Sequence, residues 1–229
     1  MARVAMALSV VVILFVATQT LADAIYIENI EVSSTYPGGH SSKWNLINDT
    51  LGGKADADTV WDTFGHFNHP DTWDKEPWVA FYFDGAYRVN DMMIWNYWRS
   101  GETQRGVCDV IVLVSSDTGD DWASYTFTAL PGVYRFDPAT TDPPAMQTIG
   151  LGGVETTAVK FQILSNWAGI WGNAWGFFGP NATPEPTPWG HNSVVGLSKV
   201  AFDGTAIPEP ATMTLLALGG LALLRRGRR

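Results

Sequence analysis

Short runs of alternating apolar and polar residues fill the middle of the chain, separated by Gly, Pro, Asp and Asn. A period of two residues is typical of β-strands that bury one face. The first run, residues 24–34, places Ile25, Ile27 and Ile30 near one face, with a slip at Asn29. No helical periodicity of useful length accompanies these runs. The pattern predicts about eight strands, at residues 24–34, 78–83, 88–98, 106–116, 122–130, 145–151, 157–166 and 194–204.

Turn-forming residues stand between these runs. Asp84-Gly85 separates the second run from the third, and residues 117–121 separate the fourth from the fifth. Many short strands joined by turns favour a β-sandwich or jelly roll over a mixed fold. We therefore expect an all-β fold, an eight-stranded jelly-roll β-sandwich over residues 25–205. A signal helix would precede it, and a short hydrophobic helix would follow it.

The first 24 residues are typical of a secretory signal peptide. Arg3 supplies the positive start, Leu8–Val16 is an apolar run, and Ala22-Asp23-Ala24 has the small residues of a cleavage site. We expect signal peptidase to cut after Ala24, with an uncleaved N-terminal anchor as the alternative. Residues 1–24 are thus assigned to the signal peptide.

The C-terminal segment, residues 206–229, joins three features in order. Pro208, Glu209 and Pro210 come first, the 14 mostly apolar residues 211–224 follow, and four arginines close the chain. A helix of 14 residues is about 21 Å long, short of the roughly 30 Å of a membrane core. The arginines would stay on the cytoplasmic side during export. We expect this segment to hold the chain in the membrane briefly rather than permanently.

This arrangement resembles the bacterial PEP-CTERM sorting signal, which has the same three parts at the extreme C-terminus. The resemblance implies recognition by an exosortase, a membrane protease-transpeptidase that removes the tail. The protein would then be exported, held in the membrane by the short transmembrane helix before cleavage, and left at the cell surface or in the extracellular matrix. A second Pro-Glu-Pro, at residues 184–186, has no hydrophobic run behind it and is expected to lie in a loop.

Charge and cysteine content narrow the classes of partner. Residues 25–205 carry nine Lys and Arg against 21 Asp and Glu. This excess of negative charge repels phosphate backbones, so nucleic acid is not an expected partner. Cys108 is the one cysteine, so no internal disulfide can form. It lies within a strand-like run, which favours a buried, apolar role over a catalytic or intermolecular thiol.

The order of the strand segments resembles the discoidin, or coagulation factor V/VIII type C, domain. The resemblance extends from Ile30 to Gly204 and lies in the succession NLINDTLGG, EPWVAFYFDGAYRVNDMMIWNYW, RGVCDVIVLVSSDTGDDW, TAVKFQILSNW and VGLSKVAFDG. It implies an eight-stranded jelly roll of the galactose-binding type.

That resemblance also implies one structural calcium ion, and here this sequence departs from the pattern. Asn48 stands where Asp is usual, and Lys199 stands where Glu is usual; an ammonium group cannot bind Ca²⁺. Asp49, Asp56 and Asp58 are the candidate replacement ligands. The alternative is a salt bridge from Lys199 to an Asp in place of the ion. No other cofactor is expected.

Aromatic residues in long loops are the candidate ligand-binding groups. The chain has 11 Trp, more than one core needs, and long loops on a rigid sandwich are the usual place for ligands. Flat rings suit the C–H faces of sugars, and guanidinium groups suit hydroxyls. The candidate contacts are Trp98, Arg99, Arg105 and Trp171, unless these rings pack as a small core under their own loops. Three loops are expected, at residues 63–77, 96–106 and 166–192. The discoidin-like fold would allow the second and third of these loops to reach the same end of the sandwich.

No catalytic motif is recognisable in the sequence. The chain has no GxSxG or HExxH, and its acids are scattered. We expect a non-enzymatic module that binds carbohydrate, in particular exopolysaccharide, outside the cell. The alternatives are a structural or adhesion protein of the matrix without a sugar site and, third, a hydrolase on the same scaffold.

Overall fold

The computed structural model describes residues 23–35, 42–47, 60–63, 74, 76–97, 105–140, 144–167, 194–208 and 218–219. The chain is all-β in these ranges, apart from short helical turns that include η1 (Lys43–Ile47) and η4 (Trp122–Ser124). The described strands are β1 (Asp23–Ala24), β2 (Ile27–Val32), β3 (Trp61–Asp62), β4 (Trp78–Asn96), β5 (Asp109–Ser115), β6 (Thr128–Ala129), β7 (Tyr134–Arg135), β8 (Met146–Ile163) and β9 (Gly196–Ala206).

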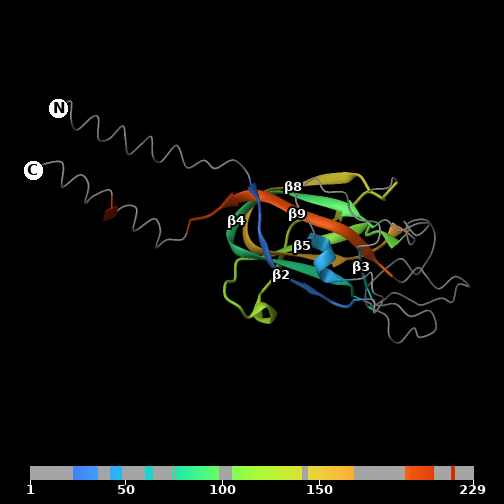
Figure 1. Cartoon of the computed structure of the whole chain (residues 1–229), viewed down its shortest axis with the longest axis horizontal. Helices are drawn as coiled ribbons and strands as arrows, with labels where there is room; N and C mark the ends of the chain where they lie inside the picture. The colour runs from blue at the N-terminus through green and yellow to red at the C-terminus, as the bar shows by residue number, and fades with distance from the viewer. Residues whose placement is uncertain are drawn as a thin grey trace, which may run out of the picture.

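The two longest strands, β4 and β8, form a bent antiparallel ribbon that joins the two layers of a sandwich (Figure 1). They pair from Trp78 with Gln162 to Trp95 with Met146, and the register breaks between Tyr82 and Tyr87. Before the break β2 pairs with β4, and after it β9 pairs with β4. Continuous hydrogen bonding therefore links all nine described strands, although they lie in two layers.

The bend explains why four of the expected strands form only two in the structure. The expected turn at Asp84-Gly85 lies at the bend, yet β4 stays paired with β8 on both sides of it. Two pairs of expected strands are thus single strands, β4 and β8. Gly152 and Gly153 of β8 lie at a second register shift, opposite the step from Val89 to Asp91 in β4, and their φ angles of 73° and 75° suit residues without a β-carbon.

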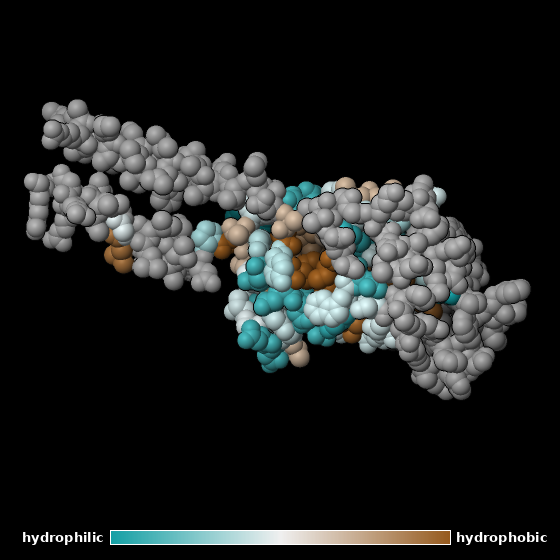
Figure 2. Space-filling model, viewed as in Figure 1, coloured by the Kyte–Doolittle hydropathy of each residue, from teal (hydrophilic) through white to brown (hydrophobic). Residues whose placement is uncertain are grey.

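The core lies between the layers and is rich in aromatic rings. Phe81 and Phe161 come from the layer that contains β2 and β5, and Phe202 comes from β9 in the other layer. The ring of Phe202 lies 5.3 Å from that of Phe81 and 6.3 Å from that of Phe161. All three side chains are completely buried. In the view of Figure 2, hydrophilic and neutral residues cover most of the described surface.

The first expected strand is confirmed at Ile27–Val32, together with its irregularity, while Ala24 belongs to the separate strand β1. Ile25, Ile27 and Ile30 are all buried, as their spacing predicts. The pairing of β2 with β4 shifts register between Ile27 and Asn29, where the alternation slips in the sequence. An extra residue at this point lets the isoleucines on both sides of the slip face the core.

The expected strand at residues 122–130 is wrong over most of its length. Residues Trp122–Ser124 form η4 instead, and β6 contains only Thr128 and Ala129. The aromatic side chains here pack on the outer face of the sheet, where Trp122 and Tyr125 contact Tyr82 of β4 at ring separations of 5.0 Å and 5.2 Å. This packing outweighs the strand preference of the sequence.

The strands run between two ends of the sandwich. The loop pole is the end that contains Thr63, Tyr97, Arg105, Asn166 and the start of β9. The tail pole is the opposite end, which contains the bend of β4 and residues 206–208. β9 spans the distance between them, about 34 Å for its 11 residues. Figure 1 shows the chain leaving the sandwich at the end of β9, away from the loop pole.

The two terminal segments of the chain meet the fold at the tail pole. β1 pairs with β9 through Asp23 with Gly204 and Ala24 with Asp203. Of the C-terminal tail beyond Pro208, only residues 218–219 are described, as part of a helix. Within the described ranges, every helix falls short of the length and hydrophobicity that a membrane crossing requires.

Candidate functional site

The loop pole brings together the ends of two loops that the sequence predicts to reach the same end of the sandwich. Gly106 forms a parallel bridge with Gly196, and Val107 forms an antiparallel bridge with Asn166. The amide of Trp167 donates to the carbonyl of Gly106 at 3.0 Å. The described ends of loops 96–106 and 166–192 are therefore side by side, as expected.

The third long loop, residues 63–77, begins at the same place. The amide of Thr63 donates to the carbonyl of Val195 at 2.9 Å, and the amide of Val195 donates to the Thr63 hydroxyl at 3.1 Å. Near the other end of this loop, Pro77 accepts a hydrogen bond from the amide of Ile163. All three loops thus start and end on main chain that is fixed at one pole.

Buried polar side chains concentrate at this pole. Side-chain amides fasten the loop ends: Asn96 Nδ2 donates to the carbonyls of Val107 and Asp137, both at 2.7 Å, and Asn166 Nδ2 donates to the carbonyl of Val194 at 3.1 Å. Burying a polar group is costly unless it is paired, so these bonds fix the geometry of the pole. Its buried polar residues are Asp62, Thr63, Asn96, Arg105, Ser165, Asn166, Ser198 and Lys199.

Arg105 is the one sugar-contact candidate among the described residues. Its side chain is only 6% exposed, so it lies inside the pole rather than on its surface. A role in ligand contact stays a prediction, and it requires the buried guanidinium group to become accessible to a ligand. Trp98, Arg99 and Trp171 lie outside the described residues.

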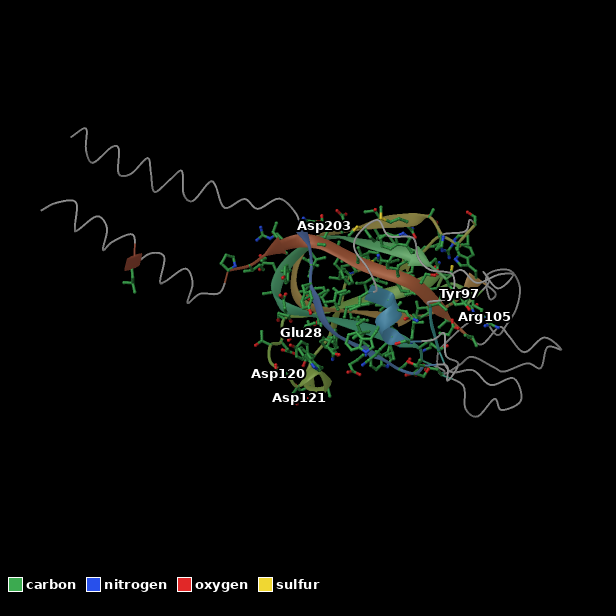
Figure 3. The ribbon with its side chains drawn as sticks, in the orientation of Figure 1. Glu28, Tyr97, Arg105, Asp120, Asp121 and Asp203 are labelled. Atoms are coloured by element: carbon green, nitrogen blue, oxygen red, sulfur yellow. The ribbon has the colours of Figure 1, made fainter. Side chains whose placement is uncertain are left out.

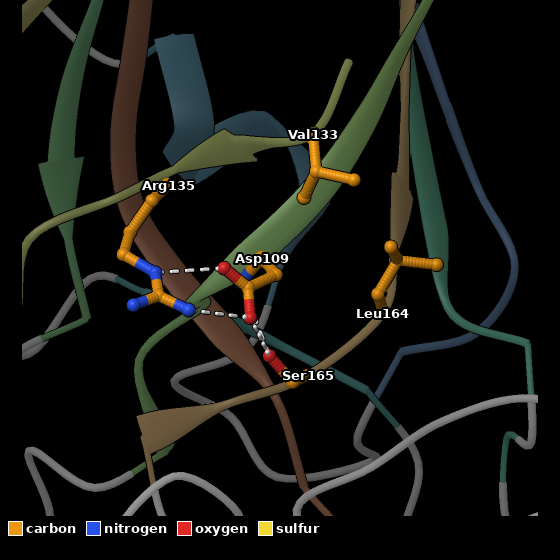
Figure 4. Close-up of a pocket in the computed structure, with 5 residues that line it drawn as sticks. All are labelled: Asp109, Val133, Arg135, Leu164 and Ser165. Atoms are coloured by element: carbon orange, nitrogen blue, oxygen red, sulfur yellow. Dashed lines mark hydrogen bonds and ion pairs between the residues drawn. The ribbon is translucent and has the colours of Figure 1, made fainter.

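A groove of about 470 Å³ lies beside the loop ends and holds an ion pair (Figure 4). Arg135 Nε and Nη2 donate to the two carboxylate oxygens of Asp109 at 2.8 Å and 3.1 Å. The Ser165 hydroxyl donates to Asp109 Oδ2 at 3.1 Å. Val133 and Leu164 supply the apolar part of the lining. Two-point contact holds the guanidinium plane in one orientation.

The electrostatics of the groove follow from this contact. The hydrogen bonds from Arg135 lower the pKa of Asp109, although partial burial opposes them. The same contact raises the pKa of Arg135, so both groups are charged at neutral pH. Arg135 is 58% exposed, which leaves part of its guanidinium edge facing solvent. Such an edge can donate to hydroxyl or carboxylate oxygens of a ligand.

Sequence reasoning missed Asp109 and Arg135. They are 26 residues apart and meet because β5 pairs with β7 in the register that places Asp109 opposite Arg135. β7 is only two residues long, and nothing in a single sequence indicates its partner or register. Cys108, next to Asp109, is completely buried as expected, and burial is the main cause that raises its pKa.

The candidate calcium ligands Asp49, Asp56 and Asp58 lie outside the described residues. Within the described part of the chain, no three His, Cys, Asp or Glu side chains are grouped as metal ligands. Lys199 is 3% exposed, and its Nζ lies 5.2 Å from the centre of the Trp95 ring. This cation–π contact contributes to holding the ammonium group at a position that the resemblance assigns to a calcium ligand.

The chain carries a recognised sorting signal. Residues 206–229 match the family described as the PEP-CTERM protein-sorting motif. The match includes the candidate motif residues Pro208, Glu209 and Pro210; Pro208 is exposed, and the other two lie outside the described residues. The motif indicates an exported protein that an exosortase processes and sorts to the cell surface.

Solved structures share the β-sandwich fold. An F5/8 type C domain from Bacteroides fragilis is 12% identical with a TM-score of 0.51, over 81% of this chain and 98% of that one. The C-terminal domain of a chitobiase from the same organism is 11% identical with a TM-score of 0.51, over 81% and 100%. These likenesses confirm the discoidin-like β-sandwich.

A third similar structure is truncated AlyQ with CBM32 and alginate lyase domains, at 14% identity and a TM-score of 0.47. The comparison covers 84% of this chain, which spans 36% of the AlyQ chain. No curated protein matches the sequence.

Proposed function

We propose that the protein is a non-enzymatic module that binds polysaccharide outside the cell through its loop pole. The observation that carries this proposal is that the ends of three long loops converge at one end of a rigid sandwich. The Gly106–Gly196 and Val107–Asn166 bridges and the Thr63–Val195 hydrogen bonds fix these ends. Ligand sites are commonly built from loops held on such a scaffold.

The proposed contact residues have two different roles in sugar recognition, ring stacking and hydrogen bonding. Trp98 and Trp171 would stack on the C–H faces of sugar rings, and Arg99 would donate to hydroxyl oxygens. Arg105 would reach the ligand from inside the pole, and Arg135 would donate from the groove beside it. The excess of Asp and Glu over Lys and Arg disfavours the approach of a polyanion, so a neutral glycan is the favoured class.

The proposal includes the route of export. Cleavage by signal peptidase after Ala24 would remove β1 and leave Ile25 as the new N-terminus. The nitrogen of Ile25 already donates to the carbonyl of Phe202 at 3.0 Å, and the Ile25 side chain is buried. The hydrogen bond and the packing of Ile25 would therefore be preserved after processing. Residues 211–224 would hold the precursor in the membrane until the exosortase acts.

Intact-mass spectrometry of the exported protein tests this route, because the mass identifies both ends of the mature chain. A mature chain that retains residues 1–24 or 211–229 contradicts the route.

Binding is tested with residues 25–208 on a glycan array and on the exopolysaccharide of the source bacterium, followed by titration calorimetry on the best ligand. Trp98→Ala and Trp171→Ala should each raise the Kd at least about tenfold, because stacked aromatic rings carry much of the binding free energy. Trp44→Ala is the matched control, since Trp44 is an exposed tryptophan on η1. Absence of binding to every glycan, or an equal loss of affinity in all three variants, would contradict the proposal.

A further inference from the structure

A cleft of about 830 Å³ lies at the tail pole, opposite the proposed glycan site. Five segments that are distant in sequence surround it, one of them β8 through Thr157. β2 supplies Glu28, the bend of β4 supplies residues 83–87, and residues 118–125 form the facing wall. Residues 206–208 close the cleft where the chain leaves the sandwich.

Carboxylates dominate the charge of this cleft. Glu28, Asp84 and Asp120 line it, and the lining that the structure describes contains no Lys or Arg. Figure 3 shows Glu28 and Asp120 at this end of the molecule. The pKa of Tyr125 in the wall is raised, first by burial and then by the negative charges of Asp117, Glu28 and Asp120. A cation that enters the cleft is therefore attracted from several sides.

Aromatic rings give the cleft firm walls. The Tyr87 hydroxyl donates to Asp84 Oδ1 at 2.6 Å, and the Tyr125 hydroxyl donates to the carbonyl of Gly119 at 3.1 Å. Trp122 packs against Tyr125 at a ring separation of 5.7 Å. Fixed rings beside carboxylates suit a guanidinium or ammonium group, which can lie over a ring face while it donates to oxygen.

The sorting motif begins at the rim of the cleft. The amide of Ile207 donates to the carbonyl of Ala86 at 2.8 Å, and Pro208, the first motif residue, lines the cleft. Proline has no N–H, so pairing with β4 cannot continue beyond Ile207. Glu209 and Pro210 follow within about 7 Å of Pro208 along the chain. An enzyme that grips these three residues would therefore lie close to the rim of the cleft.

We propose that the tail-pole cleft is a docking surface for the sorting exosortase, and that an arginine or lysine side chain of the enzyme enters it. Two observations carry this assignment: the cleft is complementary to a cation, and its rim is continuous with the motif that the enzyme binds. The substrate would thus be held by its folded domain as well as by its tail. Because the loop pole is at the other end of β9, docking leaves the glycan site open.

The test uses the full-length precursor expressed with the exosortase of its own source organism, and follows loss of the tail by intact mass over time. The double variant Glu28→Lys/Asp120→Lys should slow tail removal about three- to tenfold, because each lost charge contact weakens docking modestly. Glu76→Lys/Asp137→Lys is the matched control, since both acids are exposed and near the loop pole. This control should be processed at the wild-type rate.

A spacer variant distinguishes two effects of the folded domain on processing. The domain could help the enzyme to bind by docking, or it could hinder access of the enzyme to the motif. Six Gly and Ser residues inserted between Ile207 and Pro208 should slow processing, and the Glu28→Lys/Asp120→Lys change should then have no further effect. Three results would overturn the proposal: wild-type processing of that double variant, equal slowing of the control, or faster processing with the spacer. Glycan binding of the processed Glu28→Lys/Asp120→Lys variant and of the spacer variant should match the wild type.

Discussion

Gly196 lies so close to Tyr97 that a β-carbon on Gly196 would be 2.6 Å from Tyr97 Cδ2. The same β-carbon would be 2.5 Å from Asp62 Oδ1 and from the carbonyl oxygen of Trp61. Gly196 also forms the bridge to Gly106. The first residue of β9 therefore passes through a space that admits no side chain, and the loop ends at this pole depend on that close approach.

The first prediction is that Gly196→Ala lowers the free energy of unfolding by about 1–3 kcal/mol, the usual cost of overpacking a buried site. Urea denaturation measures the change. Gly85→Ala is the matched control, because a β-carbon at Gly85 has no neighbour within 4 Å. We expect it to change stability by less than about 0.5 kcal/mol. Equal effects of the two substitutions would show that the close approach at Gly196 is absent.

The second prediction concerns the aromatic centre of the core. Phe202 contacts Phe81 and Phe83 at ring separations of 5.3 Å, so its removal leaves a cavity that both layers line. Phe202→Ala should lower the free energy of unfolding by about 3–5 kcal/mol, and Phe202→Leu should lower it less. Tyr26→Ala, at a residue that is 66% exposed, should have little effect in the same urea titrations. If Phe202→Ala hardly changed the free energy of unfolding, the ring of Phe202 could not lie at the centre of the core.

The periodicity of the sequence is sufficient to predict the strands that bury one face, because each such strand carries its own pattern. The isoleucines of β2 and the slip at Asn29 are examples. The merging of expected strands into β4 and β8 is not predictable in this way. Asp84-Gly85 has the residues of a turn whether the chain reverses as a hairpin or bends while it stays paired with β8.

The sequence predicts that the loops at residues 96–106 and 166–192 meet at the loop pole. It does not predict that the loop at residues 63–77 joins them or that a groove lies beside them. Loop position follows from strand order, which the discoidin-like succession of segments supplies. The pairing of Asp109 with Arg135 depends on a two-residue strand, β7, and on its register. The strand expected at residues 122–130 fails for a related reason: its rings pack across the sheet on Tyr82 of β4, about 40 residues earlier in the chain.

The third prediction is that Cys108 is protected from alkylation. Its side chain is completely buried, and burial raises the pKa of the thiol, so little reactive thiolate forms near neutral pH. Iodoacetamide at pH 8 should modify the folded protein at least about 100-fold more slowly than the protein in urea, because reaction requires opening of the fold. Mass spectrometry follows the modification. Similar rates in both conditions would mean that the start of β5 is accessible.

The fourth prediction is a dependence of stability on pH that comes from Asp109. Its pKa is lowered in the folded state, mainly by the hydrogen bonds from Arg135, so folding favours the ionised carboxylate. The stabilisation is fully present above the ordinary carboxyl pKa of 3.8. It is lost as the pH falls below that value and through the lower pKa of the folded state. Urea denaturation should therefore find Asp109→Asn less stable than the wild type at pH 7, with a difference that shrinks by about half or more at pH 3.

The control for this prediction is Asp137→Asn, which removes one exposed carboxylate near the same pole. Because its side chain is exposed, we expect Asp137→Asn to differ from the wild type in stability by less than about 0.5 kcal/mol. Arg135→Met should resemble Asp109→Asn, since either change removes the hydrogen bonds that lower the pKa of Asp109. If Asp109→Asn kept the same deficit at pH 7 and pH 3, the effect would come from packing in β5 and not from the charge pair that shapes the groove.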